Sequence, residues 1–437
     1  MGFRIKNVAV LGSGVMGSGI ACQLANVGLD VLMLDMPPKT IGDQAPTDRK
    51  IVAQTALNNA IKSKPAPLYK KEFASRIALG NFEDDFHKIN QADWIIEVVV
   101  ERLDIKKQIF EKVEKYRKSD GIVTSNTSSI PISRLAEGRS EDFKKHFCGT
   151  HFFNPPRYLR LLEVIPIAET KQEVIDFFMH FGEINLGKQT VLCKDTPAFI
   201  ANRIGVMSGV KVFDLTQQYD LTIEMVDALT GSLIGRPNTG TYRLQDLVGL
   251  DTGEKVTQFV VENVTNDSFF EKLGKSPETK FMSFLLENNF LGNKTGKGFY
   301  EKTNQKDSNG KTIINALDLK TLEYKPSNRP KTPFLKSAKA IEDLKKRMAF
   351  IIDHEAPEGS FLKDYFASIF AYAAQRVPEI SDQYYPVDDA MRAGYVWDYG
   401  PFEYWDLVGF EKGISMIQSA GESVPDWVME MLKLGAY

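Results

Sequence analysis

The sequence predicts an α/β protein in which a doubly wound, mainly parallel sheet is followed by a tandem-repeat all-helical domain. Three observations predict this class. An apolar run, a glycine-rich turn, a helical pattern and a second apolar run follow one another over residues 7–35. Apolar runs then alternate with helical patterns to about residue 192, and helical patterns dominate beyond it. Within the helical part, two similar segments lie far apart in the chain.

Composition narrows the possible functions. The chain has 437 residues, of which 43% are hydrophobic, which is enough for a sizeable core and predicts two or three domains. Its net charge of -3, with acids and bases interspersed, argues against a nucleic-acid partner. Cys22, Cys148 and Cys193 are isolated, so we expect neither a disulfide framework nor a metal site. With no signal-peptide pattern and no long apolar run, we expect a cytoplasmic protein without a membrane span.

The stretch VAVLGSGVMGSGIACQLANVGLDVLMLD has the pattern of a dinucleotide-binding unit. Gly12, Gly14 and Gly17 follow the first strand in G-x-G-x-x-G spacing, and Met16 lies within the motif. The first glycine permits a tight turn, the second lets a pyrophosphate approach the backbone, and the third lets the helix pack closely on the sheet. The helix then presents free N–H groups to the phosphates.

Asp35 ends the second strand, 23 residues after Gly12. A carboxylate there can accept hydrogen bonds from both hydroxyls of an adenosine ribose, and its charge would repel a 2′-phosphate. The motif therefore favours NAD over NADP and predicts a Rossmann-type NAD-binding domain over residues 1–192. The alternative is a βαβ unit that holds no ligand.

The other elements of this domain follow in order. A helix at residues 55–62 precedes a proline-rich turn. A buried strand at 93–101, an amphipathic helix at 103–116, and a strand that runs into a polar loop at 121–129 come next. Two further strands, in FCGTHFFNPP and LLEVIPI, precede a last one at 191–193. Strands that alternate with helices in this way form parallel sheets.

The helical part divides into two repeats. TYRLQDLVGLD starts at Thr241 and PFEYWDLVGFE starts at Pro401, so an offset of 160 residues superposes them. We assign residues 193–300 to repeat 1, the polar residues 301–337 to a linker, and residues 338–437 to repeat 2. Chance similarity between two helical segments is the alternative.

His151 is the histidine with the clearest chemical context. It follows a strand in GTHFFNPP, and Glu163 lies twelve residues further on, in the next strand. Antiparallel or neighbouring strands could bring the two side chains together. A carboxylate on one ring nitrogen fixes the tautomer and stabilises the imidazolium, which leaves the other nitrogen to act as a base. The alternative is a satisfied core histidine, which is the commoner role of such a residue.

Two more polar groups could meet a ligand. The SNTSS segment at 125–129 ends a strand, and the carboxyl ends of strands in a doubly wound sheet face the ligand crevice. Its side chains could bond a substrate oxygen or the nicotinamide ribose, and a turn that caps the next helix is the alternative. Asn202 is polar in an otherwise apolar helix start, and a structural bond between domains is its alternative role.

Eight pieces of the chain together resemble the 3-hydroxyacyl-CoA dehydrogenase family of fatty-acid β-oxidation. They are GSGVMGSGIA, DWIIEVVVERLDIKK, SNTSS, GTHFFNPP, LLEVIP, CKDTPAFIANRIG, DLVGLDT and KTGKGFY. They occur in the family's order and span nearly the whole chain. The tandem helical part resembles the dehydrogenase portion of fused bacterial β-oxidation enzymes of the dehydrogenase-first type.

The resemblance implies NAD-dependent oxidation of (S)-3-hydroxyacyl-CoA to 3-oxoacyl-CoA. His151 would be the general base and Glu163 its orienting partner, while Ser128 and Asn202 would hydrogen-bond the substrate oxygen. Lys62 would meet the phosphates of coenzyme A, together with Lys64. The implied cofactor-binding residues are Gly12, Gly14, Met16, Gly17, Asp35, Glu101, Lys106, Ser128, Asn154 and Lys294.

The sequence departs from the family pattern at two places. Gly240-Thr241 stands where members of the family carry Gly-Pro, which repeat 2 keeps as Gly400-Pro401, and the stretch after Asp35 is longer. Repeat 2 could fill the place of a dimer partner, so we expect a pseudo-dimeric helical domain and a monomer. The resemblance also implies enoyl-CoA hydratase and thiolase partners. The alternatives are a dehydrogenase of a short 3-hydroxy acid without coenzyme A, a non-catalytic NAD-binding protein, and a scaffold that docks a hydratase.

Overall fold

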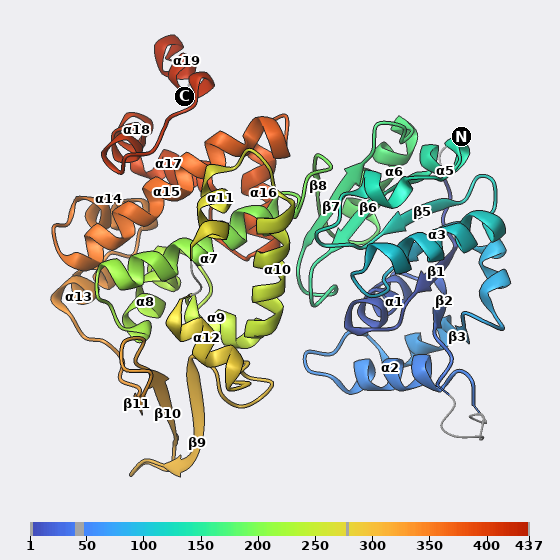
Figure 1. Ribbon diagram of the computed structural model, residues 1–437, viewed down its shortest axis with the longest axis horizontal. Helices are drawn as coiled ribbons and strands as arrows, with labels where there is room; N and C mark the ends of the chain where they lie inside the picture. Colours follow the sequence, from blue (N-terminus) through green and yellow to red (C-terminus); the bar gives the residue numbers. More distant parts are fainter. Residues whose placement is uncertain (1–2, 40–47, 277–278, 436–437) are drawn as a thin grey trace. The chain divides into compact units, whose positions relative to one another are not determined.

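The computed structural model describes residues 3–39, 48–276 and 279–435 (Figure 1). The chain forms two compact units that divide between Phe199 and Ile200, a few residues after the boundary that the sequence predicts.

The first unit contains one eight-stranded sheet in the order β3-β2-β1-β4-β5-β6-β7-β8. Neighbouring strands are parallel except β6 and β7, which are antiparallel. The strand order reverses between β1 and β4, and in doubly wound sheets such a point marks a ligand crevice at the carboxyl ends of the strands. The strands are β1 (Asn7–Leu11), β2 (Asp30–Asp35), β3 (Ile77–Asn81), β4 (Trp94–Glu97), β5 (Ile122–Ser125), β6 (Phe147–Phe152), β7 (Leu161–Pro166) and β8 (Gln189–Leu192).

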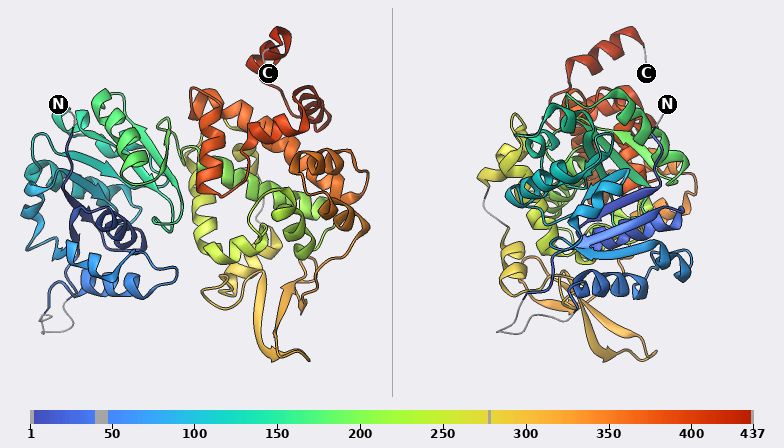
Figure 2. Two further views of the ribbon diagram at one scale, coloured as in Figure 1. Left: turned by 180° about the vertical axis from the view of Figure 1, so that it is seen from behind. Right: turned by 90° about the vertical axis from the view of Figure 1, so that its right-hand side faces the viewer.

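Helices cover both faces of this sheet (Figure 2). On one face, Val10 of β1 belongs to the same buried cluster as Ile20 of α1 and Phe178 of α6. On the other face, the ring of Phe147 lies 5.1 Å from those of Phe110 and Phe143, in α3 and α5. The helices are α1 (Val15–Asn26), α2 (Ile51–Lys62), α3 (Leu103–Tyr116), α4 (Ile132–Ala136), α5 (Glu141–Lys145) and α6 (Gln172–Ile184).

The predicted doubly wound sheet is therefore confirmed. Because helices cover both faces, its strands read as continuous apolar runs rather than alternating ones. One strand, β3, is absent from the sequence prediction, because IALGN is short and contains a glycine that weakens a strand pattern.

The second unit is mainly helical. Its first helices are α7 (Ala201–Gln218), α8 (Ile223–Thr230), α9 (Tyr242–Val248), α10 (Leu250–Asn263), α11 (Ser268–Lys275) and α12 (Lys280–Glu287). The later ones are α13 (Pro333–Ala340), α14 (Leu344–Asp353), α15 (Pro357–Ile380), α16 (Tyr385–Gly394), α17 (Pro401–Val408), α18 (Phe410–Ser419) and α19 (Asp426–Leu434).

A three-stranded antiparallel sheet occupies most of the segment that the sequence assigns to a linker. Its strands are β9 (Tyr300–Lys306), β10 (Thr312–Leu317) and β11 (Tyr324–Pro326), in the order β11-β10-β9. The linker prediction is corrected here, and the second unit is not wholly helical. Tyr300 and Leu317 are buried, whereas the far end of the hairpin is exposed and polar. An exposed hairpin has the same polar composition as a linker, which explains why the sequence predicts a linker where the structure has strands.

The two segments that the sequence pairs as repeats have matching backbones. In each, a long helix (α7 or α15) is followed by a shorter one (α8 or α16) and then by two helices that meet at a glycine. The φ angle is +98° at Gly249, between α9 and α10, and +103° at Gly409, between α17 and α18. Residues with a side chain rarely adopt a positive φ angle of this size, so both junctions favour glycine.

Candidate functional site

The glycine turn joins β1 to α1 at the carboxyl edge of the sheet. Gly12 has a φ of +110°, and a Cβ atom there would lie 2.6 Å from the carbonyl oxygen of Val98. A Cβ atom at Gly17 would lie 2.0 Å from the carbonyl oxygen of Gly12. Both glycines are therefore required by the protein's own packing.

Gly14 differs from these two glycines. A Cβ atom there would meet nothing within 4 Å, and its own φ of -56° is ordinary. Packing within the described chain therefore does not demand glycine at this position, whereas a ligand that lies against the backbone would. Gly14 is the N-cap of α1, where unpaired N–H groups favour anions. Met16 is partly buried and packs on the hydrophobic core.

Asp35 lies at the end of β2, beside the glycine turn. Its Oδ2 atom accepts hydrogen bonds from the backbone N–H of Ser13 at 2.6 Å and from the Ser13 hydroxyl at 2.5 Å, and its Oδ1 atom accepts one from the N–H of Met36. An ionised carboxylate has about four acceptor sites, so capacity for a ribose hydroxyl remains. The open position at Gly14, the N-terminus of α1 and Asp35 together fit a dinucleotide.

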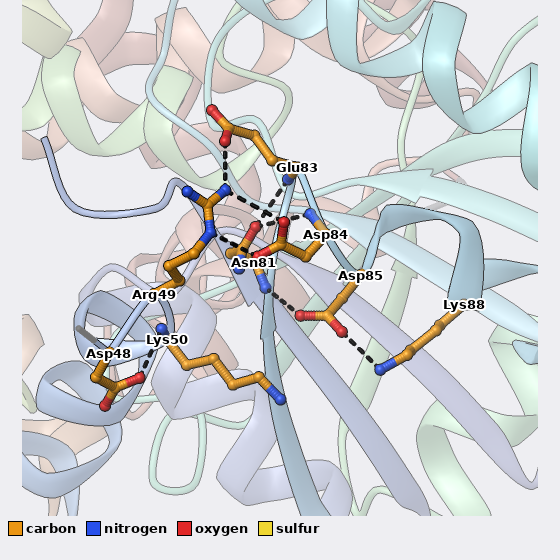
Figure 3. A network of polar contacts seen from close by, with 8 residues as sticks. All are labelled: Asp48, Arg49, Lys50, Asn81, Glu83, Asp84, Asp85 and Lys88. Atoms are coloured by element: carbon orange, nitrogen blue, oxygen red, sulfur yellow. Dashed lines mark hydrogen bonds and ion pairs between the residues drawn. The ribbon is translucent and has the colours of Figure 1, made fainter. Parts of the chain in front are cut away.

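A polar network at the end of β3 fixes the neighbouring turn (Figure 3). Asn81 accepts the N–H groups of Glu83 and Asp84, and Arg49 forms ion pairs with both carboxylates. The N–H of Phe82 donates to the carbonyl oxygen of Asp35. The longer stretch that the sequence analysis notes after Asp35 lies partly outside the described residues.

His151 and Glu163 lie opposite each other in the antiparallel pair of β6 and β7. The His151 Nδ1 atom is 2.7 Å from the Glu163 Oε2 atom, and the two side chains are 6% and 0% exposed. The imidazole ring packs against Phe153 and Phe199, with ring centroids 4.4 and 5.8 Å apart. Since Nδ1 binds the carboxylate, Nε2 is the nitrogen that can exchange a proton with a ligand.

β6 runs parallel to β5, so His151 lies at the same edge of the sheet as the SNTSS loop. Asn126 of this loop accepts the N–H of Phe152, which joins the two strand ends. The loop also binds Glu101, whose Oε1 atom accepts hydrogen bonds from the Thr127 hydroxyl at 2.5 Å, the Ser129 hydroxyl at 2.9 Å and the Ser128 N–H at 3.1 Å.

Lys106 connects Glu101 to a second, deeper carboxylate. Its Nζ atom lies 3.1 Å from Glu101 and 2.8 Å from Glu97, and the lysine side chain is 1% exposed. Burial by itself would lower the pKa of Lys106, but the two carboxylates raise it above its usual value. Burial would likewise raise the pKa of Glu101, but Lys106 and the hydroxyls of the loop lower it. Both groups are therefore charged at neutral pH.

Glu97 is the one member of this cluster that the sequence analysis misses. It also accepts hydrogen bonds from the Ser125 hydroxyl at 2.6 Å and from the N–H of Val99 at 2.7 Å, and it is fully buried. The only feature of the sequence that could have pointed to Glu97 is its position as a single carboxylate at the end of the apolar run WIIE. It reads as the polar end of a strand unless the buried lysine is known.

The remaining predicted residues are either exposed residues of the first unit or belong to the second unit. Asn154, just after β6, and Lys62 and Lys64, at and after the end of α2, are exposed. Asn202 and Lys294 belong to the second unit. There the Asn202 Oδ1 atom accepts a bond from the hydroxyl of Tyr395 at 3.3 Å, and Lys294 pairs with Asp251.

Two family models match the chain. The NAD-binding domain of 3-hydroxyacyl-CoA dehydrogenase matches residues 7–196, and the C-terminal domain of 3-hydroxyacyl-CoA dehydrogenase matches residues 199–302. A probable 3-hydroxyacyl-CoA dehydrogenase of Deinococcus radiodurans is 43% identical over 69% of this chain and 84% of that protein. The chain belongs to the 3-hydroxyacyl-CoA dehydrogenase family. The family, the NAD-binding domain and the fold class that the sequence predicts are thus confirmed.

Two longer proteins are similar to almost the whole of this chain. A probable 3-hydroxyacyl-CoA dehydrogenase of Bacillus subtilis is 42% identical over 99% of this chain and 54% of that protein. A putative fatty acid oxidation complex trifunctional enzyme of Rickettsia felis is 35% identical over 95% of this chain and 55% of that protein. The chain therefore spans about half the length of these two relatives.

Among solved structures, 3-hydroxybutyryl-CoA dehydrogenase of Escherichia coli K12 has the same fold. The TM-score is 0.72 at 22% identity, over 99% of this chain and 100% of that one. Within the described ranges, no set of three or more His, Cys, Asp and Glu side chains is arranged to hold a metal ion. No helix in those ranges combines the length and apolar character needed to cross a membrane.

Proposed function

We propose that the protein catalyses the NAD-dependent oxidation of (S)-3-hydroxyacyl-CoA to 3-oxoacyl-CoA in fatty-acid β-oxidation, in the cytoplasm. The observation that carries this proposal is the buried His151–Glu163 pair at the carboxyl edge of an NAD-binding sheet. The name of the Rickettsia felis relative supports the placement in fatty acid oxidation. A protein that only bound NAD would not need this pair.

Each residue then has a role. The Nε2 atom of His151 takes the proton of the 3-hydroxyl group, and Glu163 holds the other nitrogen and stabilises the imidazolium that forms. Bound NAD would supply the acceptor for the hydride that leaves C3. Ser128 and Asn202 would hydrogen-bond the substrate oxygen as it becomes a carbonyl, which lowers the barrier by fixed polar contacts.

The binding residues divide between the two ends of NAD. Gly14, the N-terminus of α1 and Asp35 would hold the pyrophosphate and the adenosine ribose. Glu101 and Lys106 would lie beside the nicotinamide half, with Asn154 and Lys294 nearby. Lys62 and Lys64 would meet the phosphates of coenzyme A, and repeat 2 would stand in for a dimer partner, which leaves the protein monomeric.

The experiment is the reverse reaction, oxidation of NADH by acetoacetyl-CoA, with free acetoacetate as the second substrate. We expect turnover with the thioester and little with the free acid. His151→Ala should lower kcat by about 10²–10⁴-fold, the usual contribution of a general base. His180→Ala is the matched control, because His180 is exposed on α6. Equal turnover of wild type and His151→Ala would contradict the proposal.

A further inference from the structure

Two acidic residues of repeat 1 clamp an extended piece of the chain. Asp246 of α9 accepts the N–H of Phe299 and that of Tyr300, each at 2.8 Å. Asp227 of α8 accepts the Tyr300 hydroxyl at 2.7 Å. A Cβ atom at Gly298 would lie 2.0 Å from the Asp246 carboxylate, so only glycine fits there. The clamped segment is thus glycine, an aromatic residue and tyrosine.

Repeat 2 keeps both acids in the same framework. Asp388 of α16 accepts the N–H of Phe402 at 2.8 Å, as Asp227 accepts that of Tyr242. Asp406 of α17 is the counterpart of Asp246 at the offset of 160 residues. Asp246 is buried, but Asp406 is exposed and has no hydrogen-bond partner within the described ranges.

A cavity of about 450 Å³ lies beside these two acids. It is formed by α16, α17, α18 and α19, the C-terminal helices, whose colour runs from orange-red to red in Figure 1. Six aromatic side chains of the described residues line it: Tyr384, Tyr385, Phe402, Trp405, Phe410 and Trp427. In repeat 1 the corresponding place is filled, because the ring of Phe299 packs on Tyr242 with centroids 4.7 Å apart. No described residue of repeat 2 takes the part of Gly298–Tyr300.

The charged side chains that line the cavity indicate which charge a ligand bound there would carry. Arg243 of repeat 1 lies over the ring of Tyr300 at 3.9 Å, and repeat 2 has Glu403 at this position. The cavity wall also contains Asp389. Arg392 is the one cation among the described residues of the wall, and it is already paired with Asp389 and Glu403. A basic residue beside the aromatic ones would complement these acids.

We propose that this cavity binds an extended segment of a partner polypeptide, with the sequence glycine–aromatic–tyrosine next to a lysine or arginine. The Asp406 carboxylate accepts the backbone N–H groups of the aromatic residue and the tyrosine, and Asp388 accepts the tyrosine hydroxyl. The aromatic rings enter the space between α17 and α19. This site lies outside the dehydrogenase chemistry and does not depend on it.

The test uses the full chain and the end-blocked peptide Lys-Gly-Phe-Tyr-Glu-Lys, which is the sequence of residues 297–302. Binding is measured by calorimetry and by the fluorescence of Trp405 and Trp427, since the peptide contains no tryptophan. We expect saturable binding, weakened at least tenfold when the tyrosine of the peptide is replaced by phenylalanine or its first aromatic residue by alanine.

Asp406→Asn is the decisive variant, because the exposed carboxylate is not part of the packed core. We expect it to weaken peptide binding at least tenfold with an unchanged melting temperature and unchanged NADH oxidation. Glu422→Gln, at an exposed acid outside the cavity, should bind as wild type does. Absence of saturable binding, or equal affinity of Asp406→Asn and wild type, would overturn the proposal. Sedimentation that shows a dimer lost in Asp406→Asn would make a second copy the occupant and would overturn it too.

Discussion

Two glycines of the glycine turn have different roles: Gly17 is required for packing, whereas Gly14 leaves room for a ligand. Gly14→Ala should leave the free energy of unfolding unchanged, because its Cβ atom would meet open space. The same change should weaken NADH binding by about tenfold or more, or about 1.4 kcal/mol, because the methyl group would displace the pyrophosphate. Gly17→Ala is the matched comparison and should cost about 1–3 kcal/mol of stability, because its Cβ atom would overlap a backbone carbonyl. Fluorescence titration and urea unfolding give the two quantities. A Gly14→Ala protein with normal NADH affinity would contradict the assignment.

Glu97 is expected to matter for the stability of the fold, because its carboxylate pairs with the buried ammonium group of Lys106. Glu97→Gln should destabilise the protein by about 3–5 kcal/mol, the usual effect of removing one partner of a buried pair. Glu83→Gln removes one carboxylate from Arg49 at the surface and should cost less than about 1 kcal/mol. Urea unfolding of the two variants measures the difference, and similar values for both would show that Lys106 does not need Glu97.

The residues that could be predicted from sequence are those with a local signal. The glycine spacing and Asp35 define a βαβ unit within 29 residues, so their neighbourhood follows from chain geometry. The contact of His151 with Glu163 depends on strand direction, which the sequence leaves open. The antiparallel register of β6 and β7 decides it. Glu97 could not be found, because its partner Lys106 lies on the next helix, and nothing in the sequence shows that this lysine turns inward to a buried carboxylate.

At the scale of elements, strongly apolar strands and amphipathic helices were predictable, whereas the strands with weaker apolar patterns, β3, β9 and β10, were not. Apolar periodicity marks elements that pack on a core, such as α3 or β4. Among the residues of the β9–β10 hairpin, Tyr300, Ala316 and Leu317 are buried and the others are partly or fully exposed, so its sequence carries little periodicity. Its order comes instead from the contacts of Asp246 and Asp227 with the start of β9, which are distant in sequence.

The junction of α17 and α18 at Gly409 has the backbone conformation that both repeats share, and a substitution there tests whether this conformation requires glycine. At Gly409 a Cβ atom would have space, since its nearest neighbour, the Cβ atom of Lys412, would be 3.9 Å away, but φ is +103°. Gly409→Ala should therefore cost about 1–3 kcal/mol through backbone strain alone. Gly253→Ala, inside α10, is the control. Its Cβ atom would lie 3.0 Å from Oε1 of Gln245, whose flexible side chain can move away, and alanine favours helices, so the change in stability should be less than about 1 kcal/mol. If Gly409→Ala unfolds at the same urea concentration as wild type, the backbone at this junction is not constrained as described.

For the whole molecule, the two units respond to pH in opposite ways. Burial raises the pKa of Asp388 to about 8, of Asp227 to about 7 and of Asp246 to about 6, and all three belong to the second unit. In the first unit, burial lowers the pKa of Lys188 to about 8. The ordinary values are about 4 for aspartate and about 10.4 for lysine. The folded second unit therefore binds extra protons between about pH 4 and 8. In the first unit, Lys188 makes the unfolded state bind an extra proton between about pH 8 and 10, whereas burial raises the pKa of the Cys22 and Cys148 thiols, so the folded state keeps their protons above the ordinary thiol pKa of about 8.5.

The sign of each effect follows from this proton difference. Stability falls with rising pH where the folded state holds more protons, so the second unit should weaken from pH 5 to 8. Asp388→Asn resembles the protonated carboxyl group, so it should match wild type at pH 5 and exceed its stability at pH 8. Lys188 by itself adds to the stability of the first unit as the pH rises from 8, whereas the buried Cys22 and Cys148 thiols oppose this gain, so Lys188→Met should lower the stability of the first unit at pH 9 relative to that at pH 7 when compared with wild type. Trp94 is the tryptophan of the first unit, so Trp94→Phe lets fluorescence follow urea unfolding of the second unit alone. Parallel pH profiles for Asp388→Asn and its parent would show that Asp388 is ionised in the folded protein.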